Sequence, residues 1–414
     1  MSKRKSSHEI SDRAAKRPLP MQKQHLYLLV DDWERGYSIR KLDVDAFDAD
    51  GSDSDWLPEH FTEPPVARME ATRTSSHTAP ISWPCSPAKP ASPYQPSTRI
   101  TLGLTICPWP SCRGGYTRSP FFVSVGGKLF LFTNVLAEYL GDPPPHGSSK
   151  TPWSWTTIKA RPPFYTSRII CYALHPDGRT LFVSAGSRPP RSRYYRPPPP
   201  FSSEDGQGTF SFDAERLEWT RHGDWLLPFA GQAHFDADLE SWVGLCDERD
   251  GDGCLCACDV APVAAAEFTS PPAWKLGDDR LFRRERERLH LGAKLVHMGG
   301  DGKFCLVEAM THEDDARRLD DERGPLPRRR VLRVITFGVK YDKKGELRTT
   351  RRRARSYSTE YIGKLALQQY SNFPQENLGL RLVPAQATGH GRRYGTEHPG
   401  KLAYRVCASE SELL

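Results

Sequence analysis

Three alternating cysteines are the most metal-like group in the sequence. Cys254, Cys256 and Cys258 stand in the string GCLCACDV. On a strand their side chains would share one face, because side chains alternate with a period of two. A zinc site would need a fourth ligand from elsewhere, and C-x-C does not turn around zinc as C-x-x-C does. We therefore expect small thiols that fill the buried face of a strand, and we predict no metal ligand and no cofactor.

Arginines crowd one later segment of the chain. Five of them lie within eight residues, namely Arg348, Arg351, Arg352, Arg353 and Arg355. Guanidinium groups donate bidentate hydrogen bonds to carboxylates and phosphates, so the segment could bind an acidic protein segment or a phosphate. Two alternatives are internal pairing with the acidic run Glu313–Glu322 and a solvated charged loop. We take Arg351, Arg352 and Arg353 as candidate partner-binding residues.

A second candidate partner-binding segment is rich in proline, arginine and tyrosine. It spans Ser187–Phe201, and its candidate residues are Arg191, Arg193, Tyr194, Tyr195 and Arg196. Loops on a rigid scaffold often carry binding function, which is why this segment is expected to face a protein partner.

Basic residues near the beginning of the sequence form two clusters. Lys3, Arg4 and Lys5 are followed after ten residues by Lys16 and Arg17, which is the spacing of a two-cluster nuclear import signal. The alternative is a solubilising tail. The segment lacks the apolar stretch of a secretory signal, and no run approaches a membrane span. We expect a nuclear or cytoplasmic protein that is not secreted and does not enter a membrane.

No catalytic motif is present in the sequence. G-x-S-x-G, the P-loop, H-E-x-x-H and a helix-opening G-x-G-x-x-G are all missing. The acidic run Asp48–Glu59 resembles a calcium loop, but it has Asp53 where the sharp turn needs glycine. The scattered histidines are expected to be structural. We predict no catalytic residue, although a site assembled from distant loops stays an alternative.

Composition and charge limit the classes of fold and function. The 414 residues include 32 glycines and 36 prolines, too many for a helical bundle. The net charge of +7 is uneven, with about +5 in residues 1–24 and +11 in residues 326–414, which leaves about −9 between them. An acidic body with basic ends disfavours a general nucleic-acid binder.

Strand–turn–strand patterns recur along the chain. Four hairpins are predicted around turns at Gly126-Gly127, Pro176–Gly178, Asp236–Asp238 and Gly299–Gly302, which follow one another at intervals of 51, 60 and 63 residues. Helix signals are scarce, and the clearest is the short, highly charged segment Asp279–Leu289. The intervals slightly exceed the length of a four-stranded propeller blade, so we predict an all-β fold, a β-propeller of about six blades with long Pro-rich loop insertions.

The predicted domain organisation follows from these patterns. Residues 1–24 form a disordered basic tail, residues 25–385 the propeller-like domain, and residues 386–414 a weakly structured end. Within the domain we expect a Pro/Ser/Asp-rich insertion at 48–98 and a Pro/Arg-rich loop at 187–208. Trp219, Trp225 and Trp242 are expected to pack between blades, whereas Trp153 and Trp155 could be exposed on a binding loop.

Several strings resemble known proteins. The glycine pair before a strand and the spacing from Phe212 to Trp219 are similar to kelch-type blades. A closer resemblance covers most of residues 25–384 and rests on three strings: DDWERGYSIRKLDVDAF (Asp31–Phe47), TFSFDAERLEWTRHGDWLLPFAGQAHFDADLESWVGLC (Thr209–Cys246) and HLGAKLVHMGGDGKFCLVE (His290–Glu308). These resemble domain of unknown function 1668, a family of plant proteins expanded in grasses. The resemblance implies no established activity.

The sequence therefore favours a non-catalytic protein-interaction module on a propeller scaffold, with a protein partner of unknown identity. One alternative is a propeller enzyme that acts on a small sugar or lactone. A weaker alternative is nucleic-acid binding through the basic ends. The oligomeric state does not follow from these patterns.

Overall fold

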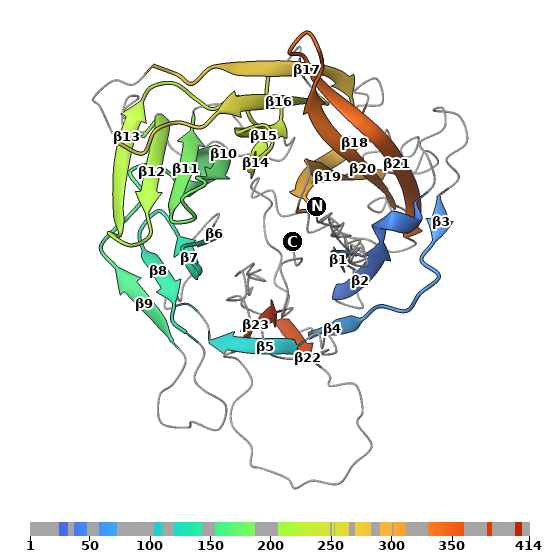
Figure 1. The fold of residues 1–414 in the computed structure, drawn as a ribbon. Coiled ribbons are helices and arrows are strands. Elements are labelled where there is room, and N and C mark those ends of the chain that lie inside the picture. The colour runs from blue at the N-terminus through green and yellow to red at the C-terminus, as the bar shows by residue number, and fades with distance from the viewer. Residues whose placement is uncertain are drawn as a thin grey trace, which may run out of the picture.

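The described part of the chain is an all-β structure. The computed structural model describes residues 25–31, 37–47, 58–72, 103–108, 110, 120–142, 154–186, 206–248, 251, 253–264, 270–282, 290–299, 302–311, 330–359, 379–382 and 402–407. Its strands pair almost entirely in antiparallel fashion, and the sheets follow one another around a ring (Figure 1). No helix among these residues is long and apolar enough to cross a lipid bilayer.

Two successive four-stranded meanders make up the largest sheet. Its order is β13-β12-β11-β10-β14-β15-β16-β17. The two halves join where Cys171–Ala173 pair in parallel with Gly231–Ala233. The strands are β10 (Ile169–Leu174), β11 (Thr180–Ala185), β12 (Gly208–Asp213), β13 (Glu218–Gly223), β14 (Gly231–Asp236), β15 (Ser241–Leu245), β16 (Cys254–Asp259) and β17 (Trp274–Arg280).

A further four-stranded meander precedes this sheet in the sequence, and another follows it. One contains β6 (Phe121–Val125), β7 (Lys128–Phe132), β8 (Ala137–Leu140) and β9 (Trp155–Ile158). The other contains β18 (His290–His297), β19 (Lys303–Thr311), β20 (Arg330–Tyr341) and β21 (Leu347–Thr359), and β3 (Glu59–His60) adds to it in parallel with β21. All four predicted hairpins are thus confirmed.

The remaining strands bring together distant parts of the chain. β1 (His25–Asp31), β2 (Tyr37–Asp43), β4 (Ala67–Thr72) and β22 (Gly379–Leu382) form one sheet, and β5 (Gly103–Pro108) pairs with β23 (Leu402–Cys407). The predicted 48–98 insertion therefore contains β3 and β4, and the predicted weakly structured end contains β23. The short 3-10 helices are η2 (Val44–Ala46) and η3 (Thr166–Arg168).

The predicted helix at Asp279–Leu289 is wrong in its described part. Asp279 and Arg280 are the last residues of β17, and residues 283–289 lie outside the described ranges. The charged residues suggested a helix, but β17 is the outer strand of its sheet, where charged side chains reach water without any helical turn. Pairing with β16 and the contact of β17 with β21 determine the local structure.

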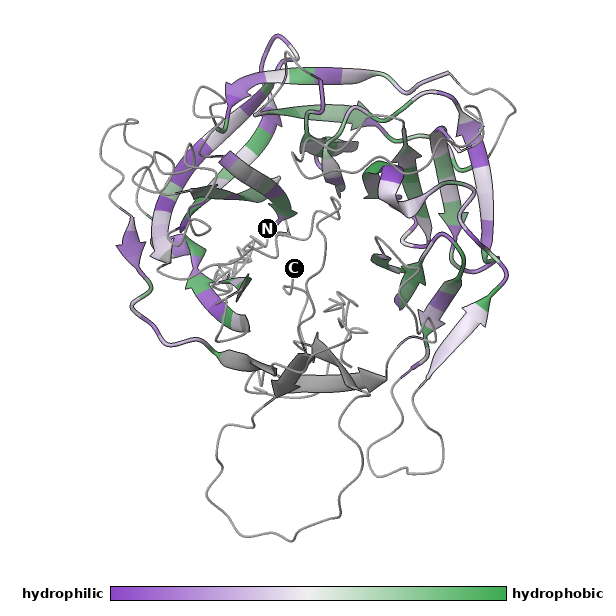
Figure 2. Ribbon diagram, turned by 180° about the vertical axis from the view of Figure 1, so that it is seen from behind, coloured by the Kyte–Doolittle hydropathy of each residue, from purple (hydrophilic) through white to green (hydrophobic). Residues whose placement is uncertain are grey.

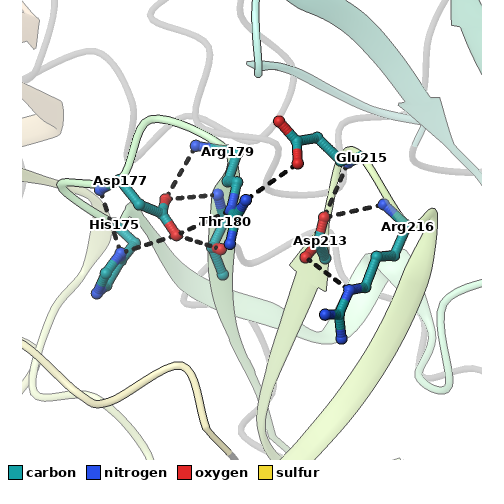
Figure 3. Close-up of polar contacts among 7 residues, drawn as sticks. All are labelled: His175, Asp177, Arg179, Thr180, Asp213, Glu215 and Arg216. Atoms are coloured by element: carbon teal, nitrogen blue, oxygen red, sulfur yellow. Dashed lines mark hydrogen bonds and ion pairs between the residues drawn. The ribbon is translucent and has the colours of Figure 1, made fainter.

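Aspartates shape the hairpin turns. Asp177 accepts hydrogen bonds from the backbone N–H of Arg179 and Thr180, both at 2.9 Å, and Asp213 does the same for residues 215 and 216. Figure 3 shows the two turns side by side, joined by an ion pair of 3.0 Å between Arg179 and Glu215. Such side-chain-to-backbone hydrogen bonds take the place of the inter-strand backbone hydrogen bonds where the chain reverses direction.

Apolar cores fill the space between successive sheets. One core joins β6 and β7 to β11 and β12, a second joins β10 and β11 to β15 and β16, a third joins β15 and β16 to β19 and β20, and a fourth joins β19 and β20 to β1 and β2. A central strand such as β19 is therefore buried on both faces: Leu306 faces one core and Val307 the next. Hydrophobic residues accordingly concentrate on the inner strands (Figure 2).

The tryptophans occupy these cores as expected, with one exception. Trp219 packs in the first core and Trp242 in the second, where the Nε1–H of Trp242 donates to the Leu174 carbonyl at 2.8 Å. The predicted exposure of Trp155 is wrong, because this residue is buried in β9 and its ring meets Phe122 edge-on. Trp153 lies outside the described residues.

Candidate partner-binding site

A long hairpin on the outside of the ring carries the arginine-rich segment. β20 and β21 are connected by a turn in which Asp342 accepts hydrogen bonds from the backbone of Glu346 at 3.0 Å and of Lys344 at 2.8 Å. These bonds, with the nearby guanidinium of Arg348, hold the pKa of Asp342 below its usual value. The tip lies against β17, since the Lys275 ammonium donates to the Gly345 carbonyl at 3.2 Å.

A β-bulge interrupts this hairpin at the arginines. Thr336 pairs with Arg353 and Gly338 pairs with Thr350, so Arg351 and Arg352 together stand opposite one residue of β20. Arg351 has a φ angle of 52°, which costs an L-residue roughly 1–2 kcal/mol. The side chain is exposed, and among the described residues it has no ion-pair or hydrogen-bond partner. Within the part of the chain that the structure describes, the bulge therefore holds an unpaired guanidinium toward solvent.

The neighbouring arginines are bound within the molecule. Arg348 forms ion pairs with Glu346 at 2.7 Å, Asp278 at 2.8 Å and Asp342 at 3.6 Å. The hydrogen bond to Glu346 is the main reason that the pKa of Arg348 is raised.

Farther along β21, Arg353 donates to the Asp45 carbonyl at 3.0 Å. Arg355 pairs with Glu59 at 3.8 Å and covers the ring of Phe47. Internal pairing was one predicted role for the segment, and it holds for Arg348 and Arg355, although with different acids from the run at 313–322, which is outside the described residues.

The outer edge of β21 is only partly paired. β3 pairs with it at Tyr357 and Ser358, and the backbone N–H of Thr349 donates to the carboxylate of Asp279 at 2.6 Å. In the described part of the chain no strand pairs with that edge between these two points. Unpaired backbone groups on an edge strand are a template for another extended segment. The arginine edge, which we define as residues 350–356 of β21, therefore offers backbone groups and exposed Arg351 and Arg353 together.

Other predicted residues fall elsewhere. Arg352, the second residue of the bulge, is half-buried. Arg191, Arg193, Tyr194, Tyr195 and Arg196 lie outside the described residues, as do the predicted import residues Lys3, Arg4, Lys5, Lys16 and Arg17. Their roles stay predictions, and so does the nuclear or cytoplasmic location.

The alternating cysteines are core residues. Cys254, Cys256 and Cys258 are all buried in β16, which confirms the prediction of space-filling thiols. The described residues contain no group of three or more metal-ligating side chains that could hold an ion. Cys256 and Cys258 share a core with two cysteines distant in sequence, Cys171 and Cys246.

Two histidine–carboxylate pairs escaped the sequence analysis. His290 meets the buried Glu308 at 2.9 Å, and His297 lies 3.6 Å from the buried Asp236. His297 also stands beside His234, whose pKa is lowered to about 4, chiefly by burial. Each histidine alone gave no signal, because its carboxylate partner comes from another strand. The His297–Asp236 pair connects β18 with β14, and the His290–Glu308 pair connects β18 with β19. Both pairs therefore link strands of the scaffold.

Comparisons with known proteins agree with the resemblance seen in the sequence. A search of curated proteins finds no match. One family model, described as protein of unknown function (DUF1668), matches residues 23–357, which include every strand from β1 to β20 and most of β21. Because this match covers most of the sequence, the chain belongs to the DUF1668 family.

Proposed function

We propose that the protein is a β-propeller that binds a protein partner through the arginine edge. The propeller is supported by four successive four-stranded antiparallel meanders, by the parallel contact of β10 with β14, and by cores that lie between sheets. In Figure 1 these four meanders follow one another around the ring in the order in which they occur along the chain. Kelch-like blades would each contribute one such meander.

The free guanidinium of Arg351 is the observation that carries the binding role. A strained backbone angle persists only where the surroundings impose it, and here it directs a cation outward that has no ion-pair or hydrogen-bond partner among the described residues. Among the described strands, none pairs with the arginine edge of β21. An extended segment could therefore add to β21 by backbone hydrogen bonds while its carboxylates meet Arg351 and Arg353.

Local charge favours a short acidic peptide segment over a nucleic acid. Asp278, Asp342 and Glu346 surround one end of the hairpin, and Glu59 stands near the other. A nucleic acid is long enough to bring its phosphates close to these carboxylates, which would repel them. A short segment with two or three acidic side chains would contact only Arg351 and Arg353, which lie between the carboxylates. The partner class is thus an acidic segment in extended conformation.

Binding of labelled peptides to the full chain tests this role. The probe is a fluorescein-labelled peptide of alternating threonine and glutamate, compared with its glutamine counterpart by fluorescence anisotropy. The glutamate peptide is expected to bind, and Arg351→Gly is expected to weaken binding about tenfold, the value of one charge-assisted pair. This variant removes the charge and also relieves the backbone strain, so lost binding cannot be attributed to unfolding.

Two controls and one competing ligand complete the test. Arg351→Lys keeps the charge and should retain most of the binding, and Arg216→Gln removes an exposed arginine from a different hairpin and should change nothing. A labelled DNA duplex forms the competing arm. Steeply salt-dependent DNA binding that is lost in Arg351→Gly would replace the peptide proposal by nucleic-acid binding. Equal affinity for both peptides would refute the proposal.

A further inference from the structure

The arginine edge lies between two segments of the chain that run beside β21. At one end β17 contacts the first residues of β21, and at the other end β3 pairs with Tyr357 and Ser358 (Figure 1). Among the described strands, none pairs with residues 350–356 between them. The arginine edge is therefore an interval with a neighbouring strand at each end.

β17 runs in the same direction as β21 where the two strands meet, although they belong to different sheets. The Lys275 ammonium donates to the Gly345 carbonyl at 3.2 Å. Farther along both strands, Asp279 accepts two hydrogen bonds from Thr349, one from the backbone N–H at 2.6 Å and one from the hydroxyl at 3.0 Å. The contacts advance together along the two strands, and the second one brings a carboxylate to the backbone of β21.

β3 also runs parallel to β21, and it shows how the side chains of an added strand meet that edge. Glu59 is in register with Tyr357, but its carboxylate lies 3.8 Å from the Nε of Arg355. Phe61, which follows two residues after Glu59, stacks on the ring of Tyr357 with the ring centroids 4.7 Å apart. When the register is continued to Phe61, both side chains contact the β21 residue that precedes their register partner by two. Side chains lean along their own strand, so an antiparallel segment would not reproduce this offset.

We propose that the acidic partner segment binds parallel to β21, with its amino-terminal end beside Asp279 and its carboxyl-terminal end beside β3. The direction rests on the proposed function, because it describes how the same acidic segment lies on the arginine edge. The segment then fills the interval in the direction of both neighbouring strands and adds its backbone to the sheet. With the offset that Glu59 shows, a carboxylate in register with Arg355 meets Arg353, and the carboxylate that meets Arg351 comes earlier in the segment.

Disulfide trapping on the full chain tests this direction. One variant carries Arg280→Cys, next to Asp279, and the other carries His60→Cys in β3; both positions are exposed. The probe is the threonine–glutamate peptide, made as long as residues 350–356 and extended by one cysteine at its amino or its carboxyl end. Threonine at both ends gives the glutamates the same spacing in either direction, so only the backbone direction distinguishes the two arrangements.

Each variant is equilibrated with each peptide in a glutathione buffer, and the adduct is measured by intact mass. An extended peptide of this length spans about 20 Å, which keeps its far end away from the introduced thiol. Arg280→Cys is expected to trap the amino-terminal cysteine and His60→Cys the carboxyl-terminal cysteine, each about tenfold more than the other peptide. The unsubstituted chain, treated in the same way, measures the background from the native cysteines.

Fluorescence anisotropy with the cysteine-free peptide separates the direction from the proposed function. Both cysteine variants should bind this peptide as the unsubstituted chain does, because neither substitution removes an arginine of the edge. Binding with the reversed trapping pattern, or with equal trapping of both peptides, would overturn the parallel direction and leave the acidic-segment role in place. A peptide that does not bind the unsubstituted chain would overturn both.

Discussion

The indole of Trp242 connects two meanders, and its replacement measures how much that connection contributes. The side chain is fully buried in the second core, next to Phe182, and its Nε1–H donates to the carbonyl of Leu174 in β10. Phenylalanine keeps an aromatic ring at this position but removes both the donor and part of the volume. Trp242→Phe therefore tests the packing between sheets without adding a new polar group.

The expected cost follows from two contributions. Loss of a buried hydrogen bond that leaves its acceptor without this donor costs about 1–3 kcal/mol. The smaller ring leaves a cavity, which adds about 1 kcal/mol at roughly 24 cal/mol per Å³. We expect Trp242→Phe to lower the free energy of unfolding by about 2–4 kcal/mol.

Urea unfolding followed by far-ultraviolet circular dichroism measures this change. Trp274→Phe is the matched control, because Trp274 is 42% exposed at the start of β17 and should change stability by less than about 0.5 kcal/mol. If both variants unfold at the same urea concentration, Trp242 does not hold the two meanders together as described, and the reasoning from its hydrogen bond fails.

Three further predictions concern the backbone and pH. Gly208→Ala should lower the free energy of unfolding in urea by more than about 2 kcal/mol, because φ is 123° and a Cβ would lie 2.1 Å from the Gly223 carbonyl oxygen. Its control is Gly178→Ala, which has open space around the added Cβ and should lower that free energy by only about 1 kcal/mol. Glu240→Gly should raise the thermal midpoint by relieving a φ of 50°, a gain of about 0.5–1 kcal/mol; an unchanged midpoint would contradict this. His234 has a folded-state pKa of about 4, so stability is complete above about pH 6.5 and falls as pH drops from there toward 4, by at most about 1.4 kcal/mol per unit. His234→Gln should flatten that decline in unfolding titrations.

Local patterns in the sequence were sufficient to predict the hairpins. Glycine and aspartate at a turn determine the local backbone, so the β6–β7, β10–β11, β14–β15 and β18–β19 hairpins could be located without tertiary information. The helix prediction failed because a charged outer strand and an exposed helix have similar composition, and only the pairing partner distinguishes them. Trp155 was misjudged because proline neighbours suggested a loop, whereas its burial depends on Phe122 of a different strand.

Long-range contacts decide the candidate sites. The arginine segment was visible in the sequence, but the bulge that exposes Arg351 depends on a register shift against β20. Likewise, Cys256 drew attention through its alternating neighbours, whereas Cys246, which lies in the same core, is separated from it by a turn and had no motif. The register of the paired strands determines both the exposure of Arg351 and the placement of Cys246 in the same core as Cys256. The spacing of residues in the sequence does not fix this register.

Burial on both faces of the inner strands restricts where function can lie. In β16 and β19 successive side chains enter two different cores, so a substitution on either face disturbs packing. The outer strands have one edge beyond the sheet, and charged residues are tolerated there, as β17 and β21 show. A scaffold of this kind can change its outer edges while its cores stay constant. Arg351 lies on an outer strand and has no ion-pair or hydrogen-bond partner among the described residues, so it is the position at which the proposed acidic segment would bind.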